Sequence, residues 1–114
     1  MPSRAVVFLS RDDRTSLRLA GACALAAAAA GDRVDVFVFG PAVRAVAEAG
    51  DDPDHAAAPL LEARAAGQVR LLACSASVLE ERVDLAVAEK VFDAVVGWTT
   101  VLEWSRGVSE RFFF

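Results

Sequence analysis

Short runs of apolar residues alternate along the chain with longer stretches whose apolar positions recur at helical spacing. Continuous runs rich in β-branched and aromatic residues are typical of strands that are buried on both faces of a sheet. Such runs occupy residues 5–9, 34–39, 69–73 and 91–97, and a fifth short strand is expected at 111–114. Strands that alternate with helices and short turns predict an α/β fold, here a three-layer α/β/α sandwich with a mostly parallel, five-stranded sheet.

The stretches between these runs predict helices, several of which end at a glycine. They cover residues 17–30, 42–49, 60–66 and 83–90, with further helices starting at Ser77 and at Thr100. Ser77 and Thr100 each precede a glutamate by three residues, which is the spacing of a capping box. Asp13 or Thr15 is expected to cap the first helix.

The length of the chain, 114 residues, is enough for one domain over residues 1–114 that buries a core without disulfides or metal. No apolar run approaches the roughly 20 residues that a bilayer requires. The first apolar run, residues 5–9, is also shorter than the roughly 7–15 residues of a secretory signal. We therefore expect a cytoplasmic protein without a membrane partner.

The charged residues argue against nucleic acid as a partner, because the net charge is −4 and the Lys and Arg residues are scattered. Two cysteines, Cys23 and Cys74, and a single histidine, His55, are too few for a metal site of the common kind. The loop over residues 10–16 lacks the glycine pattern of a dinucleotide site and the lysine of a P-loop. We expect neither a metal nor a cofactor.

Cys74 is the main candidate for chemistry because it follows a predicted strand, and ligands of parallel sheets gather at the carboxyl ends of the strands. The small residues Ser75, Ala76 and Ser77 leave room for a partner to approach the sulfur. A helix that starts just beyond would favour a thiolate or persulfide anion. The alternative is that Cys74 packs as a small hydrophobe, which is the favoured interpretation for Cys23 in the middle of a helix. We expect Cys74 to be the more accessible thiol.

Two further groups of side chains bear on this site. Arg11, in the loop over residues 10–16, is a candidate for the rim near Cys74, while the simpler interpretation makes that loop a solvated turn. Aromatic residues are concentrated near the end of the chain, where they either complete the core or form a subunit interface. They are Trp98, Trp104, Phe112, Phe113 and Phe114. We expect part of this group to lie in an interface.

Taken in order, these segments resemble the DsrE/DsrF/TusD family of small sulfur-handling proteins. The family's opening strand, Ala-rich helix and second strand are similar to "VVFLS", a loop, and "LRLAGACALAAAAAGDRVDVFVFGPAVRAV". Its third strand and cysteine-bearing turn are similar to "LLEARAAGQVRLLACSASVLEERV", and its last strand, helix and strand to "VFDAVVGWTTVLEWSRGVSERFFF". The most specific element is "ACSAS" followed by Arg82, although Val83 stands where the family often has a glycine.

The resemblance implies that Cys74 accepts a sulfane sulfur as a persulfide and passes it to a partner. Ser75, Ser77, Arg11 and Arg82 would then line its binding site, with sulfur donor and acceptor proteins as partners. It also implies self-association as a homotrimer or homohexamer. Whether such a protein acts as a sulfurtransferase or only as a carrier stays open. The alternatives are a small-molecule or nucleotide binding module and a structural subunit of a sulfur-handling complex, with Cys74 only lining the cleft.

Overall fold

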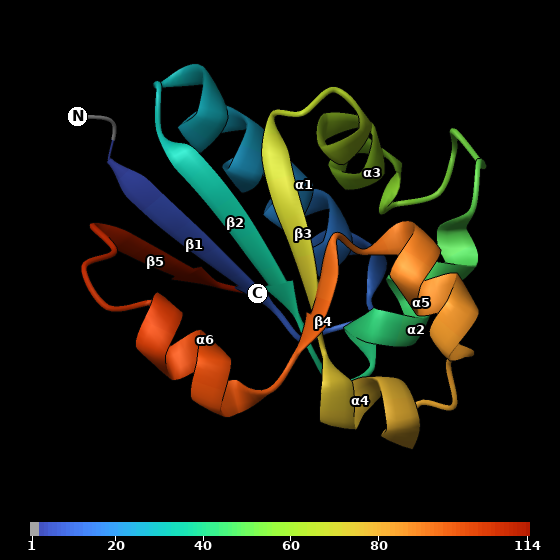
Figure 1. The fold of residues 1–114 in the computed structure, drawn as a ribbon. Helices are drawn as coiled ribbons and strands as arrows, with labels where there is room; N and C mark the ends of the chain where they lie inside the picture. The colour runs from blue at the N-terminus through green and yellow to red at the C-terminus, as the bar shows by residue number, and fades with distance from the viewer. Residues whose placement is uncertain (1–2) are drawn as a thin grey trace.

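The computed structural model describes residues 3–114, which form a five-stranded sheet with helices packed against it (Figure 1). The strands are β1 (Arg4–Leu9), β2 (Arg33–Val38), β3 (Val69–Cys74), β4 (Ala94–Val96) and β5 (Glu110–Phe113). The helices are α1 (Arg14–Ala29), α2 (Ala42–Ala49), α3 (Ala58–Ala65), α4 (Ser75–Glu80), α5 (Leu85–Val91) and α6 (Trp98–Trp104).

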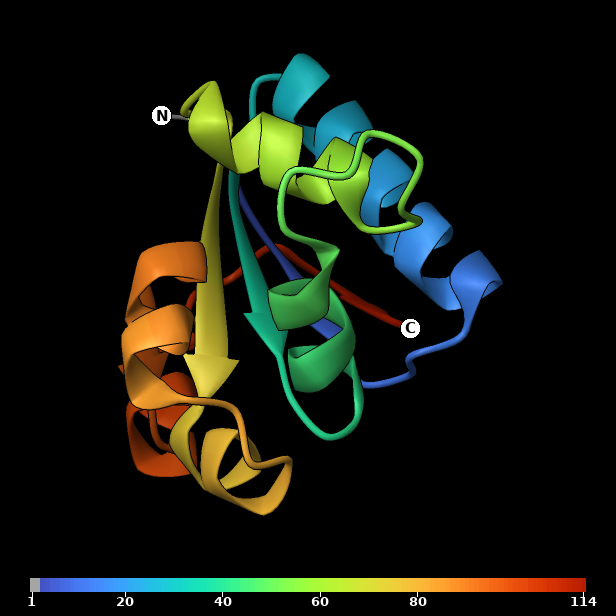
Figure 2. The same cartoon turned by 90° about the vertical axis from the view of Figure 1, so that its right-hand side faces the viewer.

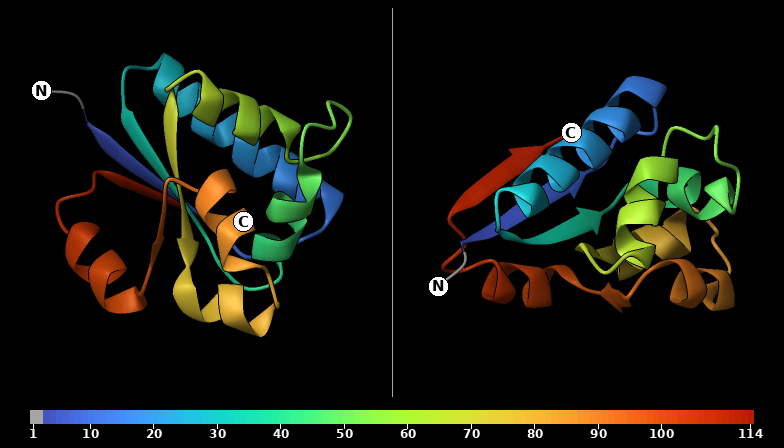
Figure 3. Two further views of the ribbon diagram at one scale, coloured as in Figure 1. Left: turned by 45° about the vertical axis from the view of Figure 1, so that its right-hand side comes forward. Right: turned by 90° about the horizontal axis from the view of Figure 1, so that it is seen from above.

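The sheet has the order β4-β3-β2-β1-β5, and every neighbouring pair is parallel. This confirms the α/β fold class and the parallel sheet expected from the alternation of strands and helices. Parallel strands need a crossover connection, and here a helix lies between each pair of successive strands. Seen from above, α1 and α6 lie on opposite sides of the strands, which gives the three layers (Figure 3).

The core is divided by the sheet into two clusters of unequal size. The larger cluster joins one face of the sheet to α1, α2 and α3, with Val78 of α4 and Ala88 of α5 at its margin. Figure 2 shows α1 and α3 side by side on that face. The smaller cluster lies on the opposite face, where Val101 of α6 packs on the strands. One face of the sheet is therefore much more thickly covered than the other.

The thinly covered face carries a lateral row of aligned apolar side chains. Phe8 is paired with Phe37 on one side and with Phe113 on the other, and Phe37 is paired in turn with Leu72. The rings of Phe8 and Phe113 stack at 4.9 Å between centroids. Phe113 is nevertheless 70% exposed, because its strand lies at the edge of the sheet. Side-chain alternation along each strand places Cys74, two residues after Leu72, on this same face.

Several expected helix boundaries are wrong, and their caps explain why. Helix α4 begins at Ser75 with Cys74 as its N-cap, not at Ser77. Helix α6 begins at Trp98 after Gly97, not at Thr100, because the Val101 N–H already donates to the Gly97 carbonyl at 3.1 Å. A capping-box spacing within a helix that has already begun caps nothing.

Two other boundaries differ for the same kind of reason, while one expected cap is confirmed. Helix α5 begins at Leu85, since the Asp84 side chain accepts the Ala86 N–H at 2.8 Å. It continues through Val91, so β4 is reduced from the expected 91–97 to three residues. Asp13 does cap α1, where its carboxylate accepts the Ser16 N–H at 2.9 Å.

Candidate functional site

Cys74 lies where the central part of the sheet ends and α4 begins. It is the last residue of β3, the N-cap of α4 and the ladder partner of Val96 in β4. This placement is the strand-end position expected from the sequence. The strand puts the thiol on the thinly covered face of the sheet, in the cluster that contains Phe37, Leu72 and Val101.

The expectation that Cys74 is the accessible thiol is wrong for the isolated chain. Cys74 is 1% exposed, whereas Cys23 in α1 is partly exposed. The sulfur lies in a cluster with Val101 of α6 and with Phe37 and Leu72 of the strands, and the partly buried Phe39 and Val96 pack against this cluster. Sequence alone placed the cysteine at the end of its strand but could not show that residues from distant parts of the chain enclose it.

Cys23 has the environment of a packing residue. It packs against the larger core cluster in the middle of α1. Burial, with a smaller contribution from the carboxylate of Glu110, raises the pKa of the Cys23 thiol. A raised pKa lowers the fraction of thiolate, which is the nucleophilic form. The structural role expected for Cys23 therefore agrees with its surroundings.

Ser75 and Ser77 follow the cysteine but have different surroundings. Ser75 is partly exposed and faces Gly97, where an added Cβ would lie 3.8 Å from the Ser75 hydroxyl oxygen. Ser77 is buried, and its hydroxyl oxygen accepts the Gly40 N–H at 2.8 Å. Gly40 has a φ of 60°, a conformation that glycine adopts without strain. Ser77 thus ties the turn after β2 to the first turn of α4.

The edge of the Cys74 cluster is formed by aromatic side chains. The Trp98 ring contacts Phe37 and Phe39 edge-on, with centroids 5.0 Å and 5.2 Å away. Trp98 is the first residue of α6 and is 43% exposed. The signal available in the sequence was the Gly97-Trp98 pair directly after a strand, at the same edge of the sheet as Cys74.

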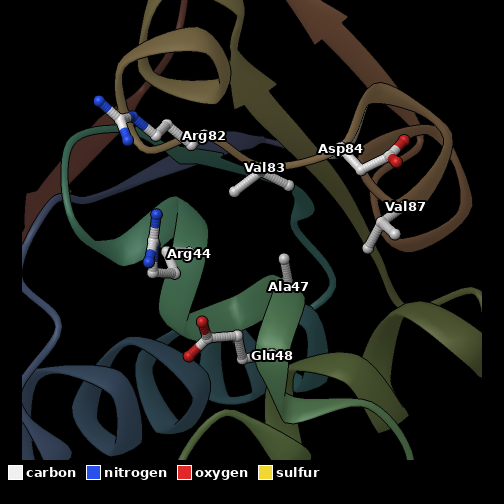
Figure 4. A pocket seen from close by; sticks show the side chains of 7 residues that line it. All are labelled: Arg44, Ala47, Glu48, Arg82, Val83, Asp84 and Val87. Carbon is white, nitrogen blue, oxygen red and sulfur yellow. The ribbon is translucent and has the colours of Figure 1, made fainter.

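Arg82 lies in a cavity of about 210 Å³ between α2 and the segment that joins α4 to α5 (Figure 4). Arg44 lines the same cavity, and its Nε donates to the Glu81 carbonyl at 3.0 Å. Two carboxylates, Glu48 and Asp84, are on the wall as well. Cys74 is not among the residues that line this cavity.

Arg11 lies in another cavity, of about 530 Å³, beside β5 and the start of α1. This cavity is lined by Ser10, Phe113 and Phe114 among others, and again does not include Cys74. The structure therefore brings Ser75 and Ser77 next to the cysteine and places Arg11 and Arg82 in cavities of their own.

Metal-ligating clusters and membrane-spanning helices were also sought in the structure. Within residues 3–114, no three side chains of the His, Cys, Asp and Glu types come together in a way that could hold a metal ion. Over the same residues, no helix has the length and apolar character needed to cross a membrane.

Comparison with known proteins decides the family. The model of the DsrE/DsrF-like family matches residues 4–105, which include every strand except β5. The chain belongs to the DsrE/DsrF-like family. This confirms the resemblance seen in the order of strands, helices and the cysteine-bearing turn. No curated protein sequence matches the chain.

The crystal structure of the ychN protein from E. coli has the same fold as this DsrE/DsrF-like chain. The two superimpose with a TM-score of 0.70, over 98% of this chain and 99% of the other, at 16% sequence identity. At that identity the likeness concerns the fold.

Proposed function

We propose that the protein is a sulfur carrier in which Cys74 holds sulfane sulfur as a persulfide. The observation that carries the proposal is the position of Cys74, at the carboxyl end of β3 and at the N-cap of α4, in a chain of the DsrE/DsrF-like family. Membership of this family suggests a role related to sulfur relay. Of the two cysteines, Cys74 alone lies at an end of the sheet where parallel folds bind ligands.

The transfer consists of two thiol–disulfide exchange steps with no net oxidation. The Cys74 thiolate attacks the outer sulfur of a donor persulfide, so that a new S–S bond forms and the donor leaves as a thiolate. An acceptor thiolate then attacks the outer sulfur on Cys74. That S–S bond breaks, the acceptor becomes the persulfide and Cys74 returns as a thiolate.

The burial of Cys74 requires the covering helix to move before either step. In-line attack on a sulfur needs a free approach, and the thiol is 1% exposed. We infer that the cover is α6, which starts directly after Gly97 and whose Val101 shares a cluster with the sulfur. Displacing Trp98 from the rings of Phe37 and Phe39 opens the face on which the sulfur lies. Closing again shields the persulfide from other thiols.

The same face supports the proposal that the protein self-associates as a homotrimer or homohexamer and works with donor and acceptor proteins. Large apolar side chains are exposed there and on α6, which is unusual for the surface of a monomer. They include Trp98 at 43%, Leu102 at 62% and Phe113 at 70% exposure. Phe112 and Phe114 instead pack against the larger core cluster.

We place the two sulfur-transfer steps in the cytoplasm, where thiols stay reduced.

The test is intact mass spectrometry after incubation of the native protein with polysulfide. The wild type should gain the mass of one sulfur atom, and the gain should disappear on treatment with a reductant. Cys23→Ser should keep the gain, while Cys74→Ser should lose it. A gain that persists in Cys74→Ser and disappears in Cys23→Ser would contradict the assignment of Cys74.

A second candidate function is favoured by the burial itself. A thiol enclosed by Phe37, Leu72 and Val101 has the surroundings of a small hydrophobe. In that case the chain is a structural subunit of a sulfur-handling complex, and Cys74 only lines the sheet. The same experiment separates the two functions, because a structural subunit gains no sulfur on either cysteine at concentrations that load a carrier.

A further inference from the structure

A second small site lies on the thinly covered face of the sheet, between α6 and the edge formed by β3 and β4. It is a cavity of about 150 Å³. Its lining consists of Arg70, Leu72, Ala94, Val96, Thr100, Val101 and Trp104. Arg70 is the one charged residue among them. The other lining side chains are apolar except for the hydroxyl of Thr100 and the indole N–H of Trp104.

The volume and the lining of the cavity determine which apolar group of a ligand fits inside it. An apolar cavity of about 150 Å³ is large enough to hold one benzene molecule. Leu72 and Ala94 are paired across β3 and β4, so they form a flat floor. Trp104, on α6, supplies an aromatic ring as one wall. A single six-membered ring packs well against such a floor and wall.

The position of the Trp104 ring is set by two arginines. The guanidinium groups of Arg4 and Arg70 lie 5.9 Å and 5.8 Å from the centroid of the ring, within the range of a cation–π contact. An Nη2 group of Arg4 also donates to the Trp104 carbonyl at 3.1 Å. The wall of the cavity is therefore fixed by contacts that come from β1 and β3 as well as from α6.

Arg70 supplies the polar recognition. Its Nε donates to Asp35 at 2.8 Å, which holds the guanidinium at the mouth of the cavity. Within residues 3–114 the Nη groups of Arg70 make no hydrogen bond, so they remain as donors to a ligand. A guanidinium binds a carboxylate through two parallel N–H···O bonds. Arg70 and Thr100 are both exposed, which places the polar end of a ligand towards solvent.

We propose that this cavity binds a small aromatic carboxylate, with the ring on Leu72 and Ala94 against Trp104 and the carboxylate on Arg70. The site does not include the Cys74 thiol. Its lining residues on β3, Arg70 and Leu72, lie four and two residues before Cys74, and Val101 of α6 belongs both to the cavity lining and to the Cys74 cluster. A ligand here would be distinct from the sulfur that the proposed carrier holds. The proposal for this cavity does not depend on the sulfur-carrier function.

The probe is benzoate, with benzyl alcohol as the neutral ring of similar size. In a Trp98→Phe background Trp104 is the only tryptophan of the chain, so its fluorescence reports on the wall of the cavity. Benzoate should change this fluorescence with a saturable curve and a Kd of about 1 mM, as expected for so small a ligand. Benzyl alcohol should bind up to about fivefold more weakly, the factor that an exposed ion pair at the top of its usual range predicts. Arg70→Gln should remove that difference.

Two matched variants test the location. Thr100→Leu places a branched side chain in the mouth of the cavity and should weaken benzoate binding at least tenfold. Thr99→Leu makes the same change on the neighbouring residue of α6, which does not line the cavity, and should bind as the parent does. Cys74→Ser should also bind normally. The proposal is overturned if benzoate gives no saturable change, if it binds no better than benzyl alcohol, or if Thr100→Leu and Thr99→Leu bind alike.

Discussion

Replacing Ser77 with alanine tests how the start of α4 is held in place. The Ser77 hydroxyl is 6% exposed and accepts the Gly40 N–H at 2.8 Å, across a separation of 37 residues. Ser77→Ala leaves that N–H without its acceptor, and a partly buried donor without a partner costs about 1–2 kcal/mol. For a domain of this size, the loss corresponds to a melting temperature lower by about 4–8 °C.

The control is Ser75→Ala, two residues earlier in the same helix. Alanine has a higher helix propensity than serine, so both substitutions raise the stability of the helix by a similar small amount. The difference in stability between the two variants therefore reports on the hydrogen bond alone. Urea denaturation should show a lower midpoint for Ser77→Ala with an unchanged m-value. In hydrogen exchange, the Gly40 amide should exchange roughly tenfold faster in Ser77→Ala. Stabilities of the two variants within about 0.5 kcal/mol of each other would refute the reasoning.

Three further predictions concern the thiols, the first helix and the exposed face. With iodoacetamide, Cys23 should react before Cys74 in the native wild type, because Cys74 is only 1% exposed. Peptide mapping that finds Cys74 labelled first would contradict the burial of this thiol. The hydrogen bonds from Ser16 lower the pKa of Asp13 below its usual 3.8, so its cap should stabilise the protein above that pH and lose its effect as the pH falls through the lowered value. In urea denaturation, the wild type should have a higher free energy of unfolding than Asp13→Ala, and this difference should be smaller at about pH 3 than at pH 7. Asp13→Asn is the control with an uncharged cap. A difference that does not change with pH would argue against this titration. Light scattering should find the wild type larger than a monomer and Phe113→Ser smaller but folded, since Phe113 is 70% exposed; a monomeric wild type at micromolar concentration would refute self-association.

The fold was predictable because its determinants are local and repeated. Each buried parallel strand is a short run of mainly apolar residues, so the bounds of β1, β2 and β3 lie within one residue of the predicted ones. The all-parallel sheet follows from placing a helix between successive strands. Boundaries failed at α5, which begins only after Asp84 caps it from inside the predicted helix, and at α4 and α6, which begin before the residues with capping-box spacing.

The sequence by itself determined the fold class and the position of Cys74 at the end of a strand, because these depend on residue order and on the periodicity of apolar positions, while its resemblance to known proteins indicated the family. Only the tertiary structure decided that Cys74 is buried in a cluster with Val101 of α6, that Ser77 binds Gly40 and that Arg82 lines a cavity away from the cysteine. Contacts of this kind join residues that are far apart in the chain, and they depend on which face of the sheet each helix packs against. The local pattern of apolar residues does not indicate against which face of the sheet a helix packs.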